Sequence, residues 1–146
     1  VKMAELEAKR ARPAAVKACV STLALPTLGY IKAQTVAIDS TVFVVTTLAL
    51  YAISIAGVLT PFAGSEDKTG YKDGQGCKAR FNKPNGLAVA SDSSLLVADT
   101  CNNRLRRVTL HGTVSTVVGG GMGFADGVGT AARFDWPYGI VVDRHC

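Results

Sequence analysis

The sequence predicts an all-β fold built from repeated four-stranded sheets, and three observations support this prediction. The chain of 146 residues is 48% hydrophobic and only 18% charged, with 15 glycines and 5 prolines. This balance suits short strands joined by tight turns better than a bundle of helices. A long stretch of the sequence recurs at a fixed spacing, and the segments between its turns are short, apolar or alternating.

Internal repeats are examined first, because a fixed period defines the whole architecture of a repeat protein. The repeat is clearest when residues 73–89 are compared with residues 126–142. At an offset of 53 residues, the elements Asp-Gly-x-Gly, Ala-Arg-Phe, Pro and Gly recur in the same order. A second match, at an offset of 56, aligns residues 58–64 with residues 114–120. The three-residue difference falls in the loop that follows, where repeats tolerate changes of length.

Within one repeat the pattern predicts four strands. They are Gly86–Ala90, Leu95–Ala98, Leu105–Thr109 and Thr113–Val118, with Gly112 in the last turn. We expect them to form one antiparallel sheet. Four strands in a unit of about fifty residues match the size of one blade of a β-propeller.

The repeat resembles the NHL repeat. The resemblance rests on residues 84–89, 96–108 and 112–114, and Asp-Thr-x-Asn-x-Arg, from Asp99 to Arg104, is its most specific part. It covers residues 58–146 clearly and residues 28–57 as a degenerate repeat. It implies a partial NHL-type propeller of about two and a half four-stranded blades. Cys101 stands where the family usually has glycine, and a left-handed backbone there would cost a residue with a β-carbon about 1 kcal/mol.

The residues of the repeat signature are expected to be structural. The phenylalanines would anchor the packing between blades, and each Pro that precedes a Gly would fix the entry into the innermost strand. Asp99 and Asn102 have short polar side chains that hydrogen-bond the backbone of their own turn. The signature comprises Phe81, Pro84, Gly86, Asp99, Thr100, Asn102, Phe134, Pro137 and Gly139.

The uncharged stretch at residues 40–60 allows two interpretations. Its 21 residues would span about 31 Å as a helix, enough for one transmembrane helix. Alternatively, residues 36–47 match residues 89–100 at the offset of 53, and residues 53–57 match residues 108–112 at 55. The register favours the second interpretation, a degenerate first blade at residues 28–64. That blade would need a cover for its uncharged outer face.

The rest of the chain divides around these segments. Residues 1–27 form a basic tail, residues 65–120 a complete blade, and residues 121–146 the start of a further one. Six basic side chains against Glu5 and Glu7 give residues 1–35 a net charge of +4, out of +5 for the whole chain. Two and a half blades do not close a ring, so we expect further chain or other chains to cover the open sheets.

No residue pattern indicates an enzyme, a cofactor or a metal. His111 and His145 are the only histidines, and they lack zinc-ligand spacing with the four cysteines, Cys19, Cys77, Cys101 and Cys146. No Ser-His-Asp set is visible. Residues 119–123 are rich in glycine but lack the Lys-Ser/Thr of a phosphate loop, so they are better explained as a turn between blades.

The leading functional prediction is therefore a non-enzymatic scaffold that binds other protein subunits through its loops. The first alternative is a single-pass accessory subunit of a large membrane complex, anchored through residues 40–60. The second is RNA binding through a basic face, with nucleic acid disfavoured because aromatic residues are not interleaved with the arginines. The expected interaction surface consists of Arg104, Arg106 and Arg107. The sequence does not indicate a compartment.

Overall fold

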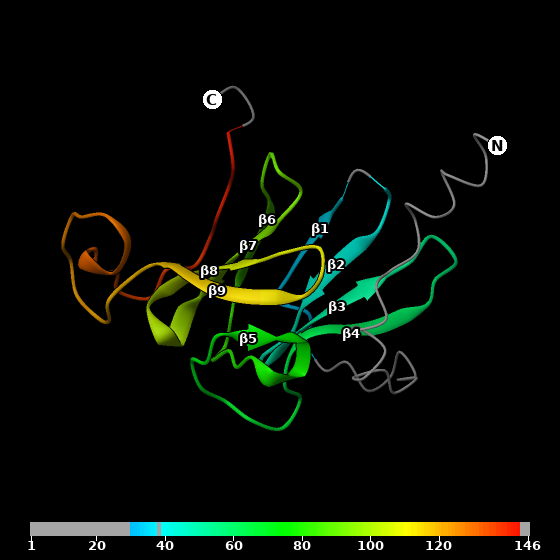
Figure 1. The fold of residues 1–146 in the computed structure, drawn as a ribbon, viewed down its shortest axis with the longest axis horizontal. Helices are drawn as coiled ribbons and strands as arrows, with labels where there is room; N and C mark the ends of the chain where they lie inside the picture. Colours follow the sequence, from blue (N-terminus) through cyan, green and yellow to red (C-terminus); the bar gives the residue numbers. More distant parts are fainter. Residues whose placement is uncertain (1–29, 38, 144–146) are drawn as a thin grey trace.

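The computed structural model describes residues 30–37 and 39–143, and the predicted basic tail at residues 1–27 lies outside them. The described residues form an all-β fold with two antiparallel sheets side by side (Figure 1). The first sheet has the order β1-β2-β3-β4 and comprises β1 (Ala33–Val36), β2 (Val42–Val45), β3 (Ala49–Ile53) and β4 (Leu59–Gly64).

The second sheet confirms the four strands that the repeat pattern predicted. It has the order β5-β9-β8-β7-β6 and comprises β5 (Gly74–Gln75), β6 (Gly86–Val89), β7 (Leu95–Asp99), β8 (Arg104–Val108) and β9 (Thr113–Val118). The additional strand β5 pairs with β9 at the outer edge. The described residues also form short 3-10 turns: η3 (Gly76–Lys78) follows β5, η4 (Thr100–Asn102) lies between β7 and β8, and η5 (Gly129–Ala131) follows β9.

Residues 40–60 form strands, so the alternative of a transmembrane helix in this segment is wrong. β2 pairs with β3, and β3 with β4, in antiparallel ladders, and the second ladder has a register shift between Leu50 and Tyr51. Two properties favour strands here: Val42, Val44 and Val45 are β-branched, and Gly57, at φ 74°, supplies a left-handed turn between β3 and β4. Among the described residues, no helix is long and apolar enough to cross a membrane.

The two sheets are copies of each other, but one of the predicted offsets is wrong by one residue. The ladders pair Val42 with Ile53 in the first sheet and Leu95 with Val108 in the second, which agrees with offsets of 53 and 55. Ile53 pairs with Leu59 as Val108 pairs with Val114, so the last strand is also offset by 55 and not by 56.

The offset stays at 55 because the turn before the last strand keeps its length. In the first sheet the Ser54 N–H donates to the Val58 carbonyl, and in the second the Thr109 N–H donates to the Thr113 carbonyl. A shift of one residue exchanges the two faces of a strand. At the predicted offset of 56, Phe62 would be equivalent to Val118. At the observed offset of 55 it is equivalent to Val117, and Phe62 is buried whereas Val117 is exposed.

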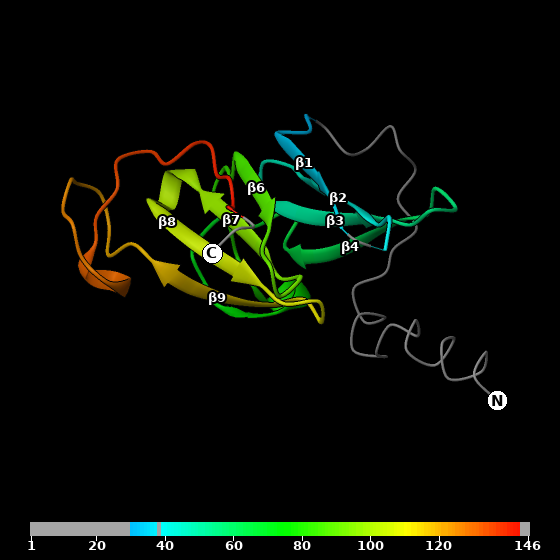
Figure 2. The ribbon, with the colours of Figure 1, turned by 90° about the horizontal axis from the view of Figure 1, so that it is seen from above.

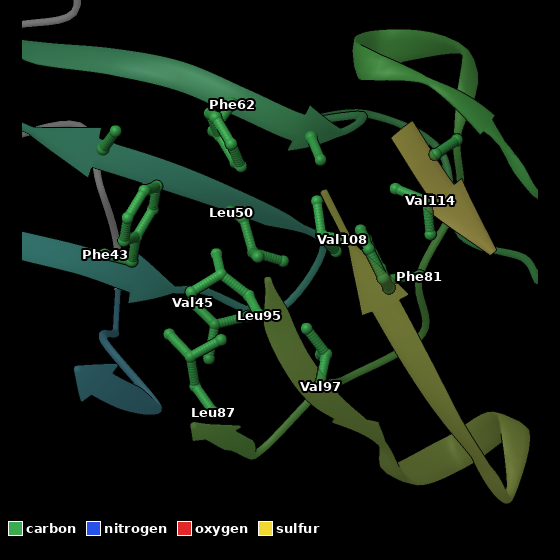
Figure 3. Packing of buried hydrophobic residues seen from close by; sticks show 13 residues of the cluster. Phe43, Val45, Leu50, Phe62, Phe81, Leu87, Leu95, Val97, Val108 and Val114 are labelled. Carbon is green, nitrogen blue, oxygen red and sulfur yellow. The ribbon is translucent and has the colours of Figure 1, made fainter. Parts of the chain in front are cut away.

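The main core lies between the two sheets (Figures 2 and 3). From the first sheet, Phe43 and Phe62 meet with ring centroids 4.9 Å apart. From the second, alternate residues of β7 point into the same space. Phe81, in the linker between the sheets, is fully buried among them, as the repeat signature predicted.

The other face of the first sheet is apolar and buried as well. Val44, Ala49, Tyr51 and Leu59 form a second cluster there, with Ile53 packed against it. This is the uncharged outer face for which the sequence predicted a need for cover. The first sheet is therefore apolar on both faces.

Residues 121–143, the predicted start of a further blade, form isolated bridges but no strand in the part that the structure describes. Met122 pairs with Phe134, and Ala125 with Arg133. The segment then passes so close to β6 that a β-carbon on Gly86 would lie 2.5 Å from the Tyr138 carbonyl oxygen. Glycine is required at position 86 because of this close approach of two backbones.

Phe81→Ala should lower the free energy of unfolding by about 3 kcal/mol, because it leaves a cavity between the two sheets. Urea denaturation of the full chain measures the loss. The matched control is Phe124→Ala, since the Phe124 side chain is 86% exposed and its removal should change stability by less than about 0.5 kcal/mol. Equal effects of the two substitutions would show that Phe81 is not a core residue.

Candidate functional site

Arg106, in the middle of β8, is the polar centre of the second sheet. Its side chain is 0% exposed. One terminal nitrogen donates to Oδ2 of Asp99 at 2.7 Å and to the Arg80 carbonyl at 3.1 Å. The other donates to Oδ1 of Asp73 at 2.7 Å and to the Lys72 carbonyl at 3.1 Å. The guanidinium carbon also lies 5.2 Å from the centre of the Phe81 ring.

Asp99, the last residue of β7, is buried as completely as Arg106. Its Oδ1 accepts the Asn82 N–H at 2.8 Å, and its Oδ2 accepts the Asn102 amide at 2.8 Å. The same amide nitrogen of Asn102 donates to the Gly70 carbonyl at 2.8 Å. The sequence suggested that these two side chains bond the backbone of their own turn; they bond the linker before the sheet instead.

Burial is the largest influence on the pKa of Asp99 and raises it, opposed by the hydrogen bonds from Asn102 and Asn82 and by the charge of Arg106. The pKa of Asp73 is shifted in the opposite direction, below its usual value. Burial alone would raise its pKa too, but hydrogen bonds from the backbone and hydroxyl of Thr116, together with Arg106, hold it below the usual range. Asp73 is half-exposed, so its desolvation is incomplete.

This network clamps residues 70–82 of the linker against the sheet. A buried guanidinium is tolerated only where its charge and its donors find partners. Two carboxylates and two carbonyls accept hydrogen bonds from the two terminal nitrogens of Arg106, and only its Nε lacks a partner. The charges of the network are thus used within the fold, and their role is to fix the shape of the sheet.

The other signature residues are placed around this clamp. Phe81 and Pro84 are buried, and Gly86 lies at the close approach of two backbones described above. Thr100 is fully buried and its hydroxyl donates to the Pro137 carbonyl at 2.8 Å, which ties residues 136–143 to the second sheet. Phe134 and Pro137 are half-buried, and Gly139 is exposed.

Position 101 does not need the glycine that is usual in the family. Cys101 lies within η4, and Asn103, at φ 53°, takes the left-handed conformation at the end of this turn. Asparagine tolerates that conformation better than most residues. The Cys101 thiol is free and half-buried, and its N–H donates to the Asn82 carbonyl at 3.1 Å.

The three arginines expected to form an interaction surface do not lie together. The inclusion of Arg106 is wrong, because its side chain is buried. Arg104 is half-buried, with its guanidinium carbon 4.2 Å from the centre of the Tyr71 ring. Arg107 points to the opposite face of the strand and pairs with Asp92 and with Ser94. Contact of Arg104 and Arg107 with a partner stays a prediction.

Sequence reasoning overlooked Asp73, although a signal was present. Asp73 and Asp126 occupy the same position in the repeat. An acidic residue that recurs in this way, ahead of a strand with alternate arginines, is a candidate partner for one of them. Among residues 30–37 and 39–143, no group of three or more His, Cys, Asp or Glu residues is arranged to hold a metal ion.

Two similar antiparallel sheets that pack face to face, joined by a clamped linker, define a propeller-type repeat protein. The family model for the NHL repeat matches residues 81–108, which include the Asp99–Arg106 pair. Residues 81–108 therefore form an NHL repeat, and the chain is similar to NHL-repeat proteins.

Similar proteins agree with this assignment. NHL repeat-containing protein 2 of Bos taurus is 36% identical over 100 residues, which cover 60% of this chain and 14% of that protein. The Homo sapiens protein of the same name is 35% identical with the same coverage. The chain thus spans about a seventh of the length of these curated relatives.

Solved structures show the same fold. A protein of unknown function from Bacteroides thetaiotaomicron superposes with a TM-score of 0.61 at 30% identity, over 70% of this chain and 27% of that one. An auxiliary nutrient binding protein from the same organism gives a TM-score of 0.65 at 25% identity, over 71% of this chain and 30% of that one.

Arg106→Met should lower the free energy of unfolding by about 3–5 kcal/mol, because it leaves the buried Asp99 carboxylate without its cation. The matched control is Arg107→Met, which breaks the half-exposed pair with Asp92 and should cost about 0–1 kcal/mol. Urea denaturation of both variants measures the difference. A loss below about 1 kcal/mol for Arg106→Met would contradict a stabilising role for the network.

Asp73 should make the stability of the chain dependent on pH in the acid range. Its folded-state pKa is lowered, so its contribution is complete above the unfolded pKa of about 3.9 and is lost as the pH falls through the folded value. Asp73→Asn should remove this part of the acid loss. Urea midpoints of both chains at about pH 6 and about pH 3 test it, and equal acid losses would exclude a role for Asp73.

Proposed function

We propose that this chain is part of a non-catalytic, protein-binding scaffold, in which propeller-type sheets hold exposed loops in fixed positions. The observation that carries the proposal is the clamp around Arg106. Its charged side chains serve to join the linker to the second sheet. Because the linker is fixed to the second sheet, the turns of this sheet do not need to reorganise when a partner binds, and the entropy cost of binding is lower.

The exposed turns offer apolar contacts at repeated positions. Ile55 and Leu110 occupy equivalent places, at the offset of 55, in the last hairpin of each sheet, and both are exposed. Each is followed two residues later by a left-handed glycine, Gly57 or Gly112. Loops supported by a rigid framework are the usual location of binding residues.

The comparison with solved structures supports a role in binding. The structure at 25% identity is described as a nutrient binding protein. We carry over only the general point that such a fold presents a binding surface, and we propose proteins as the partners of this chain. RNA is disfavoured because Arg106 is buried and Arg107 is paired with Asp92, which leaves few cations for phosphates.

The scaffold is tested by photo-crosslinking in extracts of the cells that produce the chain. A photoreactive amino acid replaces Leu110 in one version of the full chain and Ile55 in another. We expect discrete adducts that protease removes and nuclease does not. A chain without the photoreactive residue is the control. Irradiation that produces no protein adduct from either position would overturn the scaffold proposal.

RNA binding gives a separate prediction. If the partner is a protein, the chain should bind the single-stranded RNA poly(U) no more tightly than basic proteins in general do, with a Kd of about 10⁻⁴–10⁻⁶ M at physiological salt. Tight binding whose salt-dependence slope falls by about 1.4 units in the double variant Arg104→Gln, Arg107→Gln would favour RNA instead. Filter binding over a range of salt concentrations provides the measurement.

A further inference from the structure

Residues 123–134, coloured orange in Figure 1, form a loop that repeats the linker before β6. At the offset of 53 this second loop corresponds to residues 70–81, the first loop, and η5 corresponds to η3. Each loop is closed by an antiparallel bridge, and the equivalent bridges are Lys72–Arg80 and Ala125–Arg133. In both bridges the arginine N–H donates to the carbonyl of its partner at 3.0 Å. The two loops therefore share the same backbone hydrogen bonds.

The first loop binds the guanidinium of Arg106. It does so with two backbone carbonyls, the carboxylate of Asp73 and the ring of Phe81. Asp99, the remaining partner, belongs to the sheet. Two carbonyls, a carboxylate and an aromatic face suit the planar guanidinium of arginine, with its five donors, better than the compact ammonium of lysine. The first loop is thus an arginine site that a strand of the same chain fills.

The second loop presents the same groups around a pocket of about 360 Å³. Five residues line this pocket, namely Phe124, Ala125, Asp126, Arg133 and Phe134. Four of them are, at the offset of 53, the equivalents of the four residues of the first loop that contact Arg106. Asp126 is equivalent to Asp73, but within residues 30–37 and 39–143 its carboxylate has no hydrogen-bond or ion-pair partner. No described side chain therefore uses this set of acceptors.

The charges of the two loops differ in a way that favours a cation at the second. Residues 68–82 contain four basic side chains and one acidic side chain, a net charge of +3. Residues 121–135 contain one basic and two acidic side chains, a net charge of −1, because Gly or Ala replaces all three lysines. The one basic side chain, Arg133, is equivalent to Arg80, whose carbonyl binds Arg106. An arginine at this position is thus compatible with a second guanidinium.

We propose that this pocket is a binding site for an arginine side chain on an extended segment of another protein. The first loop shows the geometry, since its arginine enters from a strand, β8. Hydrogen bonds from a guanidinium to a carboxylate are stronger than those between neutral groups. A protein is favoured over RNA because proteins carry guanidinium groups and nucleic acids do not. The site rests on the scaffold function proposed above and specifies which side chain of the partner is recognised.

Fluorescence anisotropy of a labelled peptide, titrated with the full chain, tests the site. The peptide has blocked ends and the sequence of residues 102–110 with Arg104→Thr and Arg107→Thr, so that Arg106 is its only charged side chain. A matched peptide carries citrulline, the uncharged isostere of arginine, at this position. We expect the arginine peptide to bind at least about 10-fold more tightly than the citrulline peptide, because its hydrogen bonds are assisted by charge.

Asp126→Asn removes the charge of the pocket and keeps the size of the side chain. It should weaken the arginine peptide at least about 10-fold and leave the citrulline peptide unchanged. Its thermal midpoint should equal that of the parent chain, because the Asp126 carboxylate has no partner among the described residues. The matched control is Asp39→Asn, between β1 and β2, which keeps the oxygen that accepts the Thr41 N–H and should leave both affinities unchanged.

A photoreactive amino acid in place of Phe124 tests for the partner in extracts, since this side chain lines the pocket and is exposed. We expect protein adducts that an excess of the arginine peptide suppresses and an excess of the citrulline peptide does not. Self-association of the chain that Asp126→Asn abolishes would assign the arginine to a second copy, and would overturn the assignment to another protein.

Three further results would overturn the site: equal affinities of the two peptides, an unchanged affinity of the arginine peptide for Asp126→Asn, or free arginine that binds as tightly as the peptide. If Leu110 or Ile55 still gives protein adducts in extracts, such a result removes this site and leaves the scaffold standing. Absence of those adducts would remove the scaffold itself.

Discussion

The structure of the second sheet depends on the burial of one positive charge. Arg106 lies in the middle of a strand with no access to solvent, and its charge is matched by Asp99 within the sheet and by Asp73 in the linker. The desolvation of such a group is repaid only if its partners are held in place. The linker from Gly70 to Asn82 must therefore lie against the sheet, and it brings Phe81 into the core as it does so.

Among the residues that the structure describes, the first sheet has a similar strand arrangement with no ion pair among its own side chains. By the offset of 55, Tyr51 occupies the place of Arg106, within an apolar cluster that includes Val44 and Leu59. Burial and the carboxylate of Glu66 raise the pKa of the Tyr51 phenol, which stays uncharged. The fold thus accepts at this position either a neutral side chain or a fully paired charge. The equivalent position is thus filled by the Tyr51 phenol in the first sheet and by the Arg106 guanidinium with its two carboxylates in the second.

The sequence predicted the strands well because their pattern is local. Alternation and turn glycines placed β6 to β9, and the repeat register correctly favoured strands over a membrane helix at residues 40–60. The register of the last strand was wrong because Val58 and Gly64 happen to match Val114 and Gly120 by type, whereas the turn fixes the alignment one residue earlier. The burial of Arg106 and the pairing of Arg104 with Tyr71 were missed, since both depend on a linker whose path no local pattern describes.

The clamp also determines what counts as a folding unit. Asp73 and Arg106 are separated by 33 residues, and Asn102 reaches Gly70 across 32. Closing such a loop has an entropy cost that local hairpins avoid. The hairpin β7–β8 alone would leave the Arg106–Asp99 pair open to water on the side where the linker lies. Cooperative folding of the second sheet therefore includes the linker, so its boundary lies upstream of the first repeat strand, between Gly64 and Gly70.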